Sequence, residues 1–411
     1  MKSNYKNLRP FICKVDKRNK GLVVDNLKGL SMTKDFREST SNIIGTDMSK
    51  YKIVEQWQFA CDFMSVIRVH AFPVVLNFDI EPVLVSPAYP VFKIKDHEIL
   101  DPEYLMMWFR RSEFDRYADF KCDSAIRGGF GWEEMCDIEL PIPSIEKQRE
   151  IVREYNMVNE RIMLNEQLIQ KLDDTAQTIY KQWFVDFDFP ISKEYAQSIN
   201  KPNLEGQPYK SSGGKMEFCN ILGMEKPICI KSDYIENYVK LSQGQVINTK
   251  TNHLIQETGL PLLRIQDLKS HEEHIFMSPS VGKTKVASRD DIIVSRTGIV
   301  GLTFRHRKGV VHNNCFKVRT ISEQLTSDFL FWFLKSKDIE RQMFNLASGS
   351  VQADLSHQKF NKLPVLLPDN ISQNTLSRYL NTIENRSENH LKVIKVLNQL
   401  RILILKKMSK A

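Results

Sequence analysis

Apolar residues recur at alternating spacings of four and three along residues 145–184. This spacing predicts a long helix with one apolar stripe, because a 3.5-residue repeat keeps the stripe on the side where a second helix packs. The intervening positions are mostly charged or amide residues, which favours a two-helix coiled coil over a long helix packed on an ordinary core. At about 1.5 Å per residue the stripe spans about 50 Å. Its positions are Ile151, Tyr155, Val158, Ile162, Asn165, Ile169, Leu172, Ala176, Ile179 and Trp183.

The same spacing returns 225 positions later, in the last 36 residues, where seven of ten stripe positions are apolar. We interpret the two helices as antiparallel partners in one seam. Asn165 and His390 would then meet near its centre and could fix the register. Ser387 and Arg401 interrupt the second stripe, so contact with another subunit is an alternative there. The second set is Leu376, Leu380, Ile383, Ser387, His390, Ile394, Leu397, Arg401, Ile404 and Met408.

The segments before the two helices repeat as well. PEYLMMWFRRSEFDR (102–116) matches SDFLFWFLKSKDIER (327–341), and IELPIP (138–143) matches NKLPVLLP (361–368). YLMMWF and FLFWFL are apolar nearly all round, which is typical of buried helices. Short β-branched runs predict strands in both halves. These runs are Pro73–Leu76, Pro82–Val85, Val91–Ile94, Asp291–Ser295, Val300–Phe304 and Val310–Val311.

The fold class that follows is α+β, with two mixed domains, two long antiparallel coiled-coil helices and a pseudo-two-fold internal repeat. Residues 191–233 are rich in Gly, Pro, Ser and Lys, a composition typical of a linker. The expected boundaries are a first domain at 1–143, a helix at 144–190, a linker at 191–233, a second domain at 234–367 and a second helix at 368–411.

Composition sets outer bounds on function. The net charge of +8 permits binding to a polyanion without requiring it. The seven cysteines are widely spaced, with no C-x-x-C pair, which argues against a disulfide framework or a structural zinc site and suits a reducing cytoplasm. No signal peptide and no run of 18 apolar residues is present, so we expect a cytoplasmic protein without a membrane span.

The first helix ends in an aromatic cluster, IYKQWFVDFDFP (179–190), before Pro190 stops it. One interpretation is that the rings anchor the helix onto its domain. The other is that Trp183, Phe184 and Phe187 form a docking surface for a partner protein.

The chain resembles the specificity subunits of type I restriction-modification enzymes over essentially its whole length. The most specific stretch is LPIPSIEKQREIV with its seam helix and QTIYKQWFVDFDFP, followed by GQPYKSSGGKM (206–216). In the second half, LPLLRIQDL, RDDIIVSRTGIVG and LASGSVQADLSHQKFNKLPVLLP follow the family's usual run into the distal helix, whereas ISQNTLSRYL is less regular.

The resemblance implies two target-recognition domains, each reading one half of a split site on double-stranded DNA, with the helices as a spacer. The chain itself would be non-catalytic and bind no cofactor. Two methyltransferase subunits with S-adenosylmethionine, and restriction subunits with ATP and Mg, would join it in a prokaryotic cytoplasm. The alternatives are a specificity subunit of a methylation-only or two-part type II system, or a coiled-coil adaptor that binds no DNA.

The sequence contains no complete motif for catalysis, phosphate binding or a nuclease metal site. The N/D-P-P-Y/F tetrapeptide of adenine methyltransferases is missing. Gly282-Lys283-Thr284 lacks the Gly that a phosphate-binding loop carries five residues earlier, where Met277 stands. Asp290-Asp291 has no partner motif for a nuclease metal. We therefore expect no catalytic residue and no metal site.

Candidate DNA contacts are the basic and amide residues in predicted loops and at strand ends, since Lys and Arg bind phosphates and Arg, Asn and Gln read base edges. For any one of them, a solvated surface charge is the alternative. The first domain offers Lys17, Arg18, Lys20, Arg68 and Arg127. The second offers Arg264, Gln266, Arg296, Arg305, Arg307 and Lys308.

Overall fold

The computed structural model describes residues 5–40, 45–123, 130–347 and 353–410. The chain divides into two compact units. Unit 1 combines Met1–Gln167 with His390–Ala411, and unit 2 is Leu168–Asn389. Each unit therefore holds one globular domain together with one half of each long helix, α5 (Ile145–Phe184) and α11 (Asn370–Lys407). The expected boundaries separated domains from helices, whereas the compact units include parts of both.

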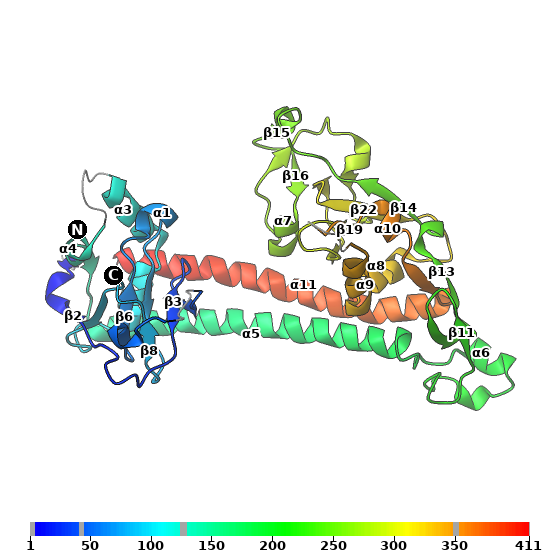
Figure 1. Ribbon diagram of the computed structural model, residues 1–411, viewed down its shortest axis with the longest axis horizontal. Helices are drawn as coiled ribbons and strands as arrows, with labels where there is room; N and C mark the ends of the chain where they lie inside the picture. Colours follow the sequence, from blue (N-terminus) through cyan, green and yellow to red (C-terminus); the bar gives the residue numbers. More distant parts are fainter. Residues whose placement is uncertain (1–4, 41–44, 124–129, 348–352, 411) are drawn as a thin grey trace. The chain divides into compact units, whose positions relative to one another are not determined.

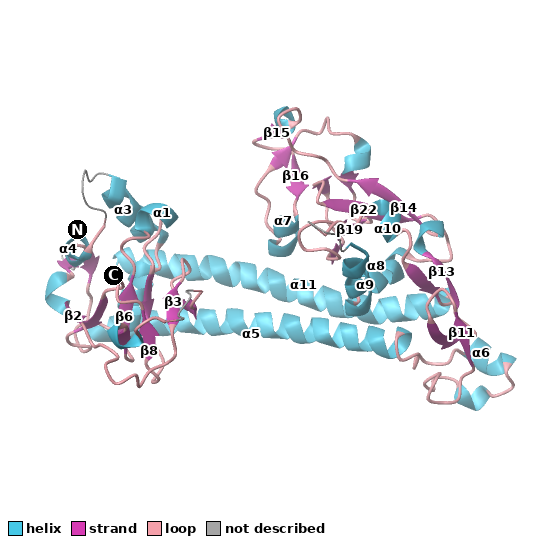
Figure 2. Cartoon of the chain, viewed as in Figure 1, coloured by secondary structure: helices cyan, strands magenta, loops and turns pink. Residues whose placement is uncertain are grey.

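Unit 1 is built on an antiparallel sheet of order β2-β9-β6-β7, drawn as magenta arrows in Figure 2. Its strands are Ile12–Val15, Val91–Ile94, Gln58–Cys61 and Val74–Leu76. The smaller strand pairs are β1 (Tyr5–Asn7) with β10 (Glu139–Pro141), β3 (Lys28–Leu30) with β4 (Phe36–Glu38), and β5 (Lys52–Val54) with β8 (Val83–Val85). The helices are α1 (Val66–Val69), α2 (Pro102–Phe109), α3 (Ser112–Asp123) and α4 (Trp132–Cys136), with short 3₁₀ turns η1 (Arg9–Phe11), η2 (Met48–Lys50) and η7 (Met408–Lys410).

Helix α2 supplies the centre of the unit 1 core. Asp101 caps it by accepting from the N–H groups of Glu103 and Tyr104, and Pro102 opens it with a fixed φ. Seven of its eight residues, all except Glu103, are buried. Phe109 meets the sheet edge-on at Phe59, and Phe59 stacks on Phe92 with ring centroids 4.7 Å apart. Burying each such ring is worth about 1.5–3 kcal/mol.

Unit 2 repeats the architecture. Its main sheet has the order β14-β22-β19-β20, with the same antiparallel pairings as in unit 1. These strands are Val239–Gln243, Cys315–Thr320, Ile292–Ser295 and Thr303–Phe304. Helix α8 (Ser327–Lys335) takes the place of α2, and α9 (Lys337–Ala347) the place of α3. The predicted internal repeat and fold class are confirmed.

The second domain carries an additional sheet of order β15-β17-β16-β21-β18, labelled in part in the green and yellow section of Figure 1. Its strands are Ile255–Gln256, Phe276–Met277, Leu260–Leu263, Gly309–Val311 and Val286–Ala287. The remaining elements of unit 2 are α7 (Ile265–Ser270), α10 (His357–Phe360), the pair β13 (Lys231–Tyr234) with β23 (Pro364–Leu367), and the 3₁₀ turns η4 (Ile235–Asn237), η5 (Asn252–Leu254) and η6 (Lys283–Lys285).

The segment expected as a linker, 191–233, is folded into unit 2. It forms α6 (Lys193–Ser198), η3 (Pro202–Leu204) and a hairpin of β11 (Met216–Cys219) with β12 (Met224–Pro227). Tyr209 is fully buried and stacks on Phe189 at 4.9 Å. Gly214 makes this possible, because a Cβ there would lie 2.3 Å from the Tyr209 ring. The glycines of this segment therefore serve close packing as well as turns.

The two long helices run antiparallel within each unit. In unit 1, Lys407 pairs with Glu154 at 3.4 Å and Arg401 donates to Asn159 at 3.4 Å. In unit 2, the Trp183 ring meets Tyr379 edge-on, with centroids 6.4 Å apart. In both units the residue number on α11 falls as that on α5 rises, as the antiparallel prediction required.

Candidate functional site

The polar centre of the seam brings Asn165 and His390 together in unit 1. Asn165 Nδ2 donates to the Arg161 carbonyl at 2.7 Å, which leaves Asn165 Oδ1 to accept from His390 Nδ1 at 2.6 Å. Only 9% of Asn165 is exposed. A shift of one helix along the other would leave this buried amide without its partner, so the contact favours a single register.

The other seam positions differ in burial along the helices. Where the helices pack on a domain the side chains are buried, and they include Ile151, Tyr155, Val158, Ile162, Ile404, Leu376 and Leu380. Toward the middle they are half-buried, as seen for Ile169, Leu172, Ile179, Ile383, Ile394 and Leu397. The ends of the seam thus belong to the domain cores, and the middle is a narrower helix–helix contact.

A buried glutamine joins each long helix to its domain, at positions 225 residues apart. In unit 1 Gln148 accepts from Asp101 N at 2.9 Å and donates to the carbonyls of Ile99 and Pro143, both at 2.9 Å. In unit 2 Gln373 accepts from Thr326 N and donates to the carbonyls of Gln324 and Pro368, at 2.8–2.9 Å. Both glutamines are fully buried. The helix thereby leaves each domain with the same geometry.

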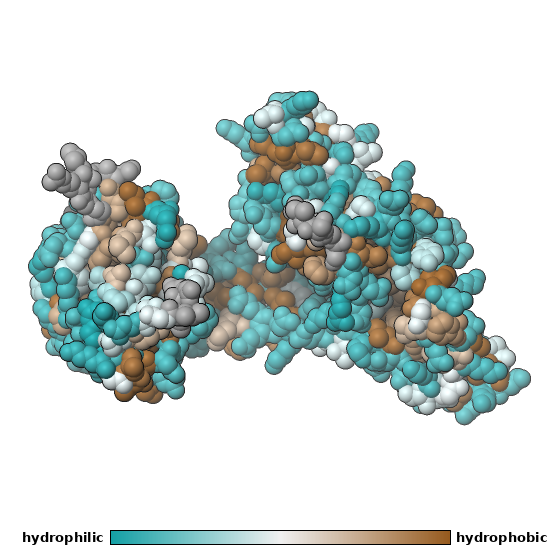
Figure 3. Space-filling model, viewed as in Figure 1, coloured by the Kyte–Doolittle hydropathy of each residue, from teal (hydrophilic) through white to brown (hydrophobic). Residues whose placement is uncertain are grey.

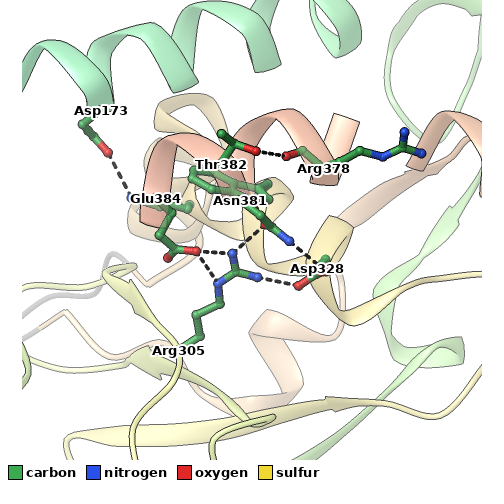
Figure 4. A network of polar contacts seen from close by, with 9 residues as sticks. Asp173, Arg305, Asp328, Arg378, Asn381, Thr382 and Glu384 are labelled. Carbon is green, nitrogen blue, oxygen red and sulfur yellow. Dashed lines mark hydrogen bonds and ion pairs between the residues drawn. The ribbon is translucent and has the colours of Figure 1, made fainter. Parts of the chain in front are cut away.

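A second contact that is repeated in both units is a hydrogen bond from an asparagine to a carboxylate. Asn156 donates to Glu103 in unit 1 at 2.7 Å, and Asn381 donates to Asp328 in unit 2 at 3.0 Å. In unit 2 this contact also holds Arg305, whose guanidinium reaches Asp328, Asn381 and Glu384 (Figure 4). Its side chain is 6% exposed and lies over the Phe331 ring at 4.1 Å. Arg305 therefore fastens the β20 end of the sheet to α8 and α11.

The aromatic cluster at the end of α5 lies inside unit 2. Trp183, Phe184 and Phe187 are 8%, 3% and 1% exposed. Phe184 packs edge-on against Phe329 of α8 at 5.1 Å. These positions correspond to the anchoring interpretation. As the chain is folded, the three rings offer little surface to a partner.

The candidate cations of unit 1 lie around the β2–β3 loop and α1. Lys17 pairs with Glu55 at 2.5 Å, and Arg18 donates to the Lys50 carbonyl at 2.7 Å and pairs with Asp16. Lys20 and Arg68 are exposed. Arg127 lies outside the described residues.

Two arginines of unit 2 are oriented by carboxylates. Arg264 donates to the buried Asp267 at 2.6 and 2.9 Å, and Arg296 donates to Asp354 at 2.8 and 2.7 Å. Hydrogen bonding from Arg296 holds the pKa of Asp354 below its usual range. Ion-paired arginines held in one rotamer are suited to presenting their remaining N–H groups in a fixed direction.

The remaining candidates of unit 2 lie on or near the run 305–308 and on α7. Gln266 and Lys308 are exposed. The Arg307 guanidinium lies against the His271 ring. Burial and the positive charge of Arg307 lower the pKa of His271 to about 4, so that imidazole is neutral at physiological pH. The structure thus separates Arg305, which is internal, from its exposed neighbour Lys308.

Comparison with known proteins finds similarity in the second half of the sequence and over most of the chain. A family model described as a type I restriction modification DNA specificity domain matches residues 232–399. The type I restriction enzyme HindI specificity subunit of Haemophilus influenzae is 23% identical over 388 residues, covering 80% of each chain. The chain is thus similar in sequence to a type I specificity subunit. The crystal structure of a type I restriction-modification S subunit from M. genitalium has the same fold, with a TM-score of 0.53 at 11% identity over 98% of this chain and 95% of that one.

Among the described residues, no group of three His, Cys, Asp or Glu side chains is placed to hold a metal. No helix within the described ranges is long and apolar enough to cross a membrane.

Two sets of functional candidates escaped the reasoning from sequence. The buried glutamines had a usable signal, since Gln148 and Gln373 stand at the repeat spacing of 225. A second set, the cations of a pocket formed by β14, β18 and β22, had no signal apart from Lys308 in its basic run, because its members come from segments far apart in the chain.

Proposed function

We propose that this chain confers a two-part DNA specificity on both methylation and restriction by a type I restriction-modification complex. The observation that carries the proposal is the duplicated sheet, β2-β9-β6-β7 and β14-β22-β19-β20, joined to its helix by the same glutamine contacts in both units. The scaffolds are alike while the exposed loop cations differ. Two similar frames with different surfaces suit the reading of two different half-sites.

The proposed DNA contacts are the candidates named from the sequence, apart from Arg305. Exposed lysines and arginines would bind backbone phosphates, and the carboxylate-oriented Arg264 and Arg296 would donate to base edges. We leave Arg305 out, because its guanidinium is committed inside unit 2. The proposed set is Lys17, Arg18, Lys20, Arg68, Arg127, Arg264, Gln266, Arg296, Arg307 and Lys308.

The seam would act as the spacer between the two readers, with the domain boundaries expected from sequence. Its length is set by α5, which runs over 40 residues, or about 60 Å. The Asn165–His390 contact would keep that length constant by preventing slippage of one helix on the other. Half-sites one turn apart in the major groove are separated by about 34 Å, which a spacer of this order can accommodate.

Partner subunits would contact the exposed apolar side of the seam helices. On α11, Val393, Val396, Leu400 and Leu403 repeat the 3-4-3 spacing beside the seam and are 43–63% exposed. Apolar side chains appear in brown on the viewed face of the helices in Figure 3. An exposed apolar stripe with helical spacing is suited to a partner's helix. We assign it to two methyltransferase subunits, which would bring S-adenosylmethionine; restriction subunits would bring ATP and Mg.

The experiment is co-expression of the chain with its cognate methyltransferase, followed by mapping of methylated adenines across the host genome. The proposal expects one motif made of two short half-sites with a fixed gap. A methylated motif without a gap, or no sequence-specific methylation in a complex that assembles, would refute it.

A further inference from the structure

A cavity of about 550 Å³ in unit 2 is lined by six cations. It lies where strands β14, β18 and β22 meet residues 279–289. One carboxylate, Asp291, lines it together with the hydroxyls of Ser242, Thr284 and Ser288. The cations that line it are Lys240, Lys283, Arg289, Lys308, Lys317 and Arg319.

The inner wall of this cationic pocket is rigidly built. Asp291 is 1% exposed and accepts from Ser288 N at 2.7 Å and from Arg319 Nε at 2.8 Å. Lys317 is 7% exposed, donates to the Val286 carbonyl at 2.6 Å and lies 3.9 Å from Asp291. One buried carboxylate thus orients two cations and neutralises only one of them, so the wall keeps a net positive charge.

The rim of the pocket holds four cations, Lys240, Lys283, Arg289 and Lys308, which are all exposed. Among the described residues, no side chain forms a hydrogen bond or an ion pair with the side-chain charge of any of the four. Four like charges around one hollow repel one another, and an anion that enters the hollow relieves that repulsion.

We propose that the cationic pocket binds backbone phosphates of duplex DNA; this rests on the proposed function and names a phosphate contact of unit 2. The donors are of the type that binds phosphate, as point charges from Lys and a fork from Arg. None of the described residues that line the pocket is aromatic, so it offers no stacking surface for a nucleoside. The lining therefore favours the phosphate of a polymer over recognition of a free nucleotide.

At the same register, the described residues of unit 1 do not repeat the buried pair of Lys317 and Asp291. The strand partners of Lys317, which are Ser242 and Ile293, correspond to Cys13 and Gln58, the partners of Lys93. Lys93 is exposed rather than buried. The position of Asp291, two residues before Ile293, is held in unit 1 by Gln56, which carries no charge. The Asp291 wall of the pocket is therefore not part of what the two sheets share.

The test uses the assembled complex of the chain with its methyltransferase partner. The variant is K240Q/K283Q/R289Q, which removes rim charge without touching the Asp291 wall. The matched control is K193Q/K201Q/K210Q, which removes the same charge from exposed lysines on the segment after α5. Affinity for cognate and for unrelated duplexes is measured over a range of salt concentrations.

The proposal expects equal losses on both duplexes for the rim variant. Each lost phosphate contact lowers the salt slope by about 0.9, so three contacts lower it by about 2.7, which is about a hundredfold in affinity at about 0.15 M salt. The control should keep the wild-type slope. If the rim variant keeps the wild-type salt slope in a complex that still prefers cognate DNA, the phosphate assignment of the pocket is wrong and the proposed function stands. A wild-type complex without sequence preference overturns the proposed function.

Inorganic pyrophosphate, titrated into the same complexes without DNA, separates a polymer site from a small-anion site. The proposal expects weak, salt-sensitive binding of pyrophosphate. Tight binding that the rim variant loses, together with an unchanged DNA salt slope, would assign the pocket to a small polyphosphate and overturn the DNA assignment.

Discussion

Replacement of Arg305 by glutamine tests whether that side chain is structural. Its guanidinium reaches Asp328 at 2.6 Å, Asn381 at 2.7 Å and Glu384 at 2.9 Å, in a site where Glu384 is 16% exposed. Removing one partner of a buried ion pair costs about 3–5 kcal/mol. Asp328 is half-exposed, so we take the lower value, about 3 kcal/mol. In a unit the size of Leu168–Asn389, this corresponds to about 6–12 °C in Tm.

The measurement is thermal unfolding followed by circular dichroism, beside the DNA affinity of the methyltransferase complex. The matched control is K308Q, three residues away in the same basic run, where the side chain is exposed. We expect K308Q to melt within about 1 °C of wild type and to bind DNA more weakly. If R305Q melts like wild type and weakens DNA binding as K308Q does, then Arg305 faces DNA and the buried network is not its role.

Three further perturbations bear on the fold. Gln148→Leu and Gln373→Leu each leave one backbone N–H and two backbone carbonyls without a hydrogen-bond partner. Each substitution should lower the free energy of unfolding, measured by urea titration, by about 2–4 kcal/mol. A loss below about 1 kcal/mol would mean that these hydrogen bonds are dispensable. Leu380→Ala should cost about 2–5 kcal/mol and the half-buried Leu172→Ala clearly less, and equal Tm shifts would contradict the uneven seam. Burial would raise the pKa of Asp291, but hydrogen bonds from Ser288 and Arg319 outweigh it and lower that pKa. Wild type should therefore be stabilised over Asp291→Asn above about pH 4 and lose that advantage as pH falls through the folded pKa, whereas a constant Tm difference down to pH 3 would exclude this linkage.

The repeated elements of this fold could be predicted from the sequence. The 4-3 spacing of apolar residues predicted both long helices, and their position after two equivalent segments predicted the antiparallel pairing. The β-branched runs at 74–76, 83–85 and 91–94 form strands, as predicted. The apolar composition of YLMMWF and FLFWFL was enough to predict that both segments form buried helices.

What the sequence left undecided depends on contacts between distant segments. Arg305 and Lys308 stand in one basic run, and only the tertiary position of Asp328 and Glu384 makes one internal and the other exposed. The composition of 191–233 predicted a linker, yet burial of Tyr209 against Phe189 folds it into a core. The cationic pocket is formed by three strands and a loop, so no local sequence pattern predicts it.

The central claim, that two DNA readers are held apart by a spacer of fixed length, is tested most directly by methylation mapping of a lengthened seam. One heptad is inserted after Asn165 and a matching heptad after His390, and the methylated motif is compared with that of wild type. A heptad adds about 10 Å of helix, or up to about 3 base pairs of DNA. The account predicts the same two half-sites with a longer gap. An unchanged gap, or altered half-sites, would contradict it.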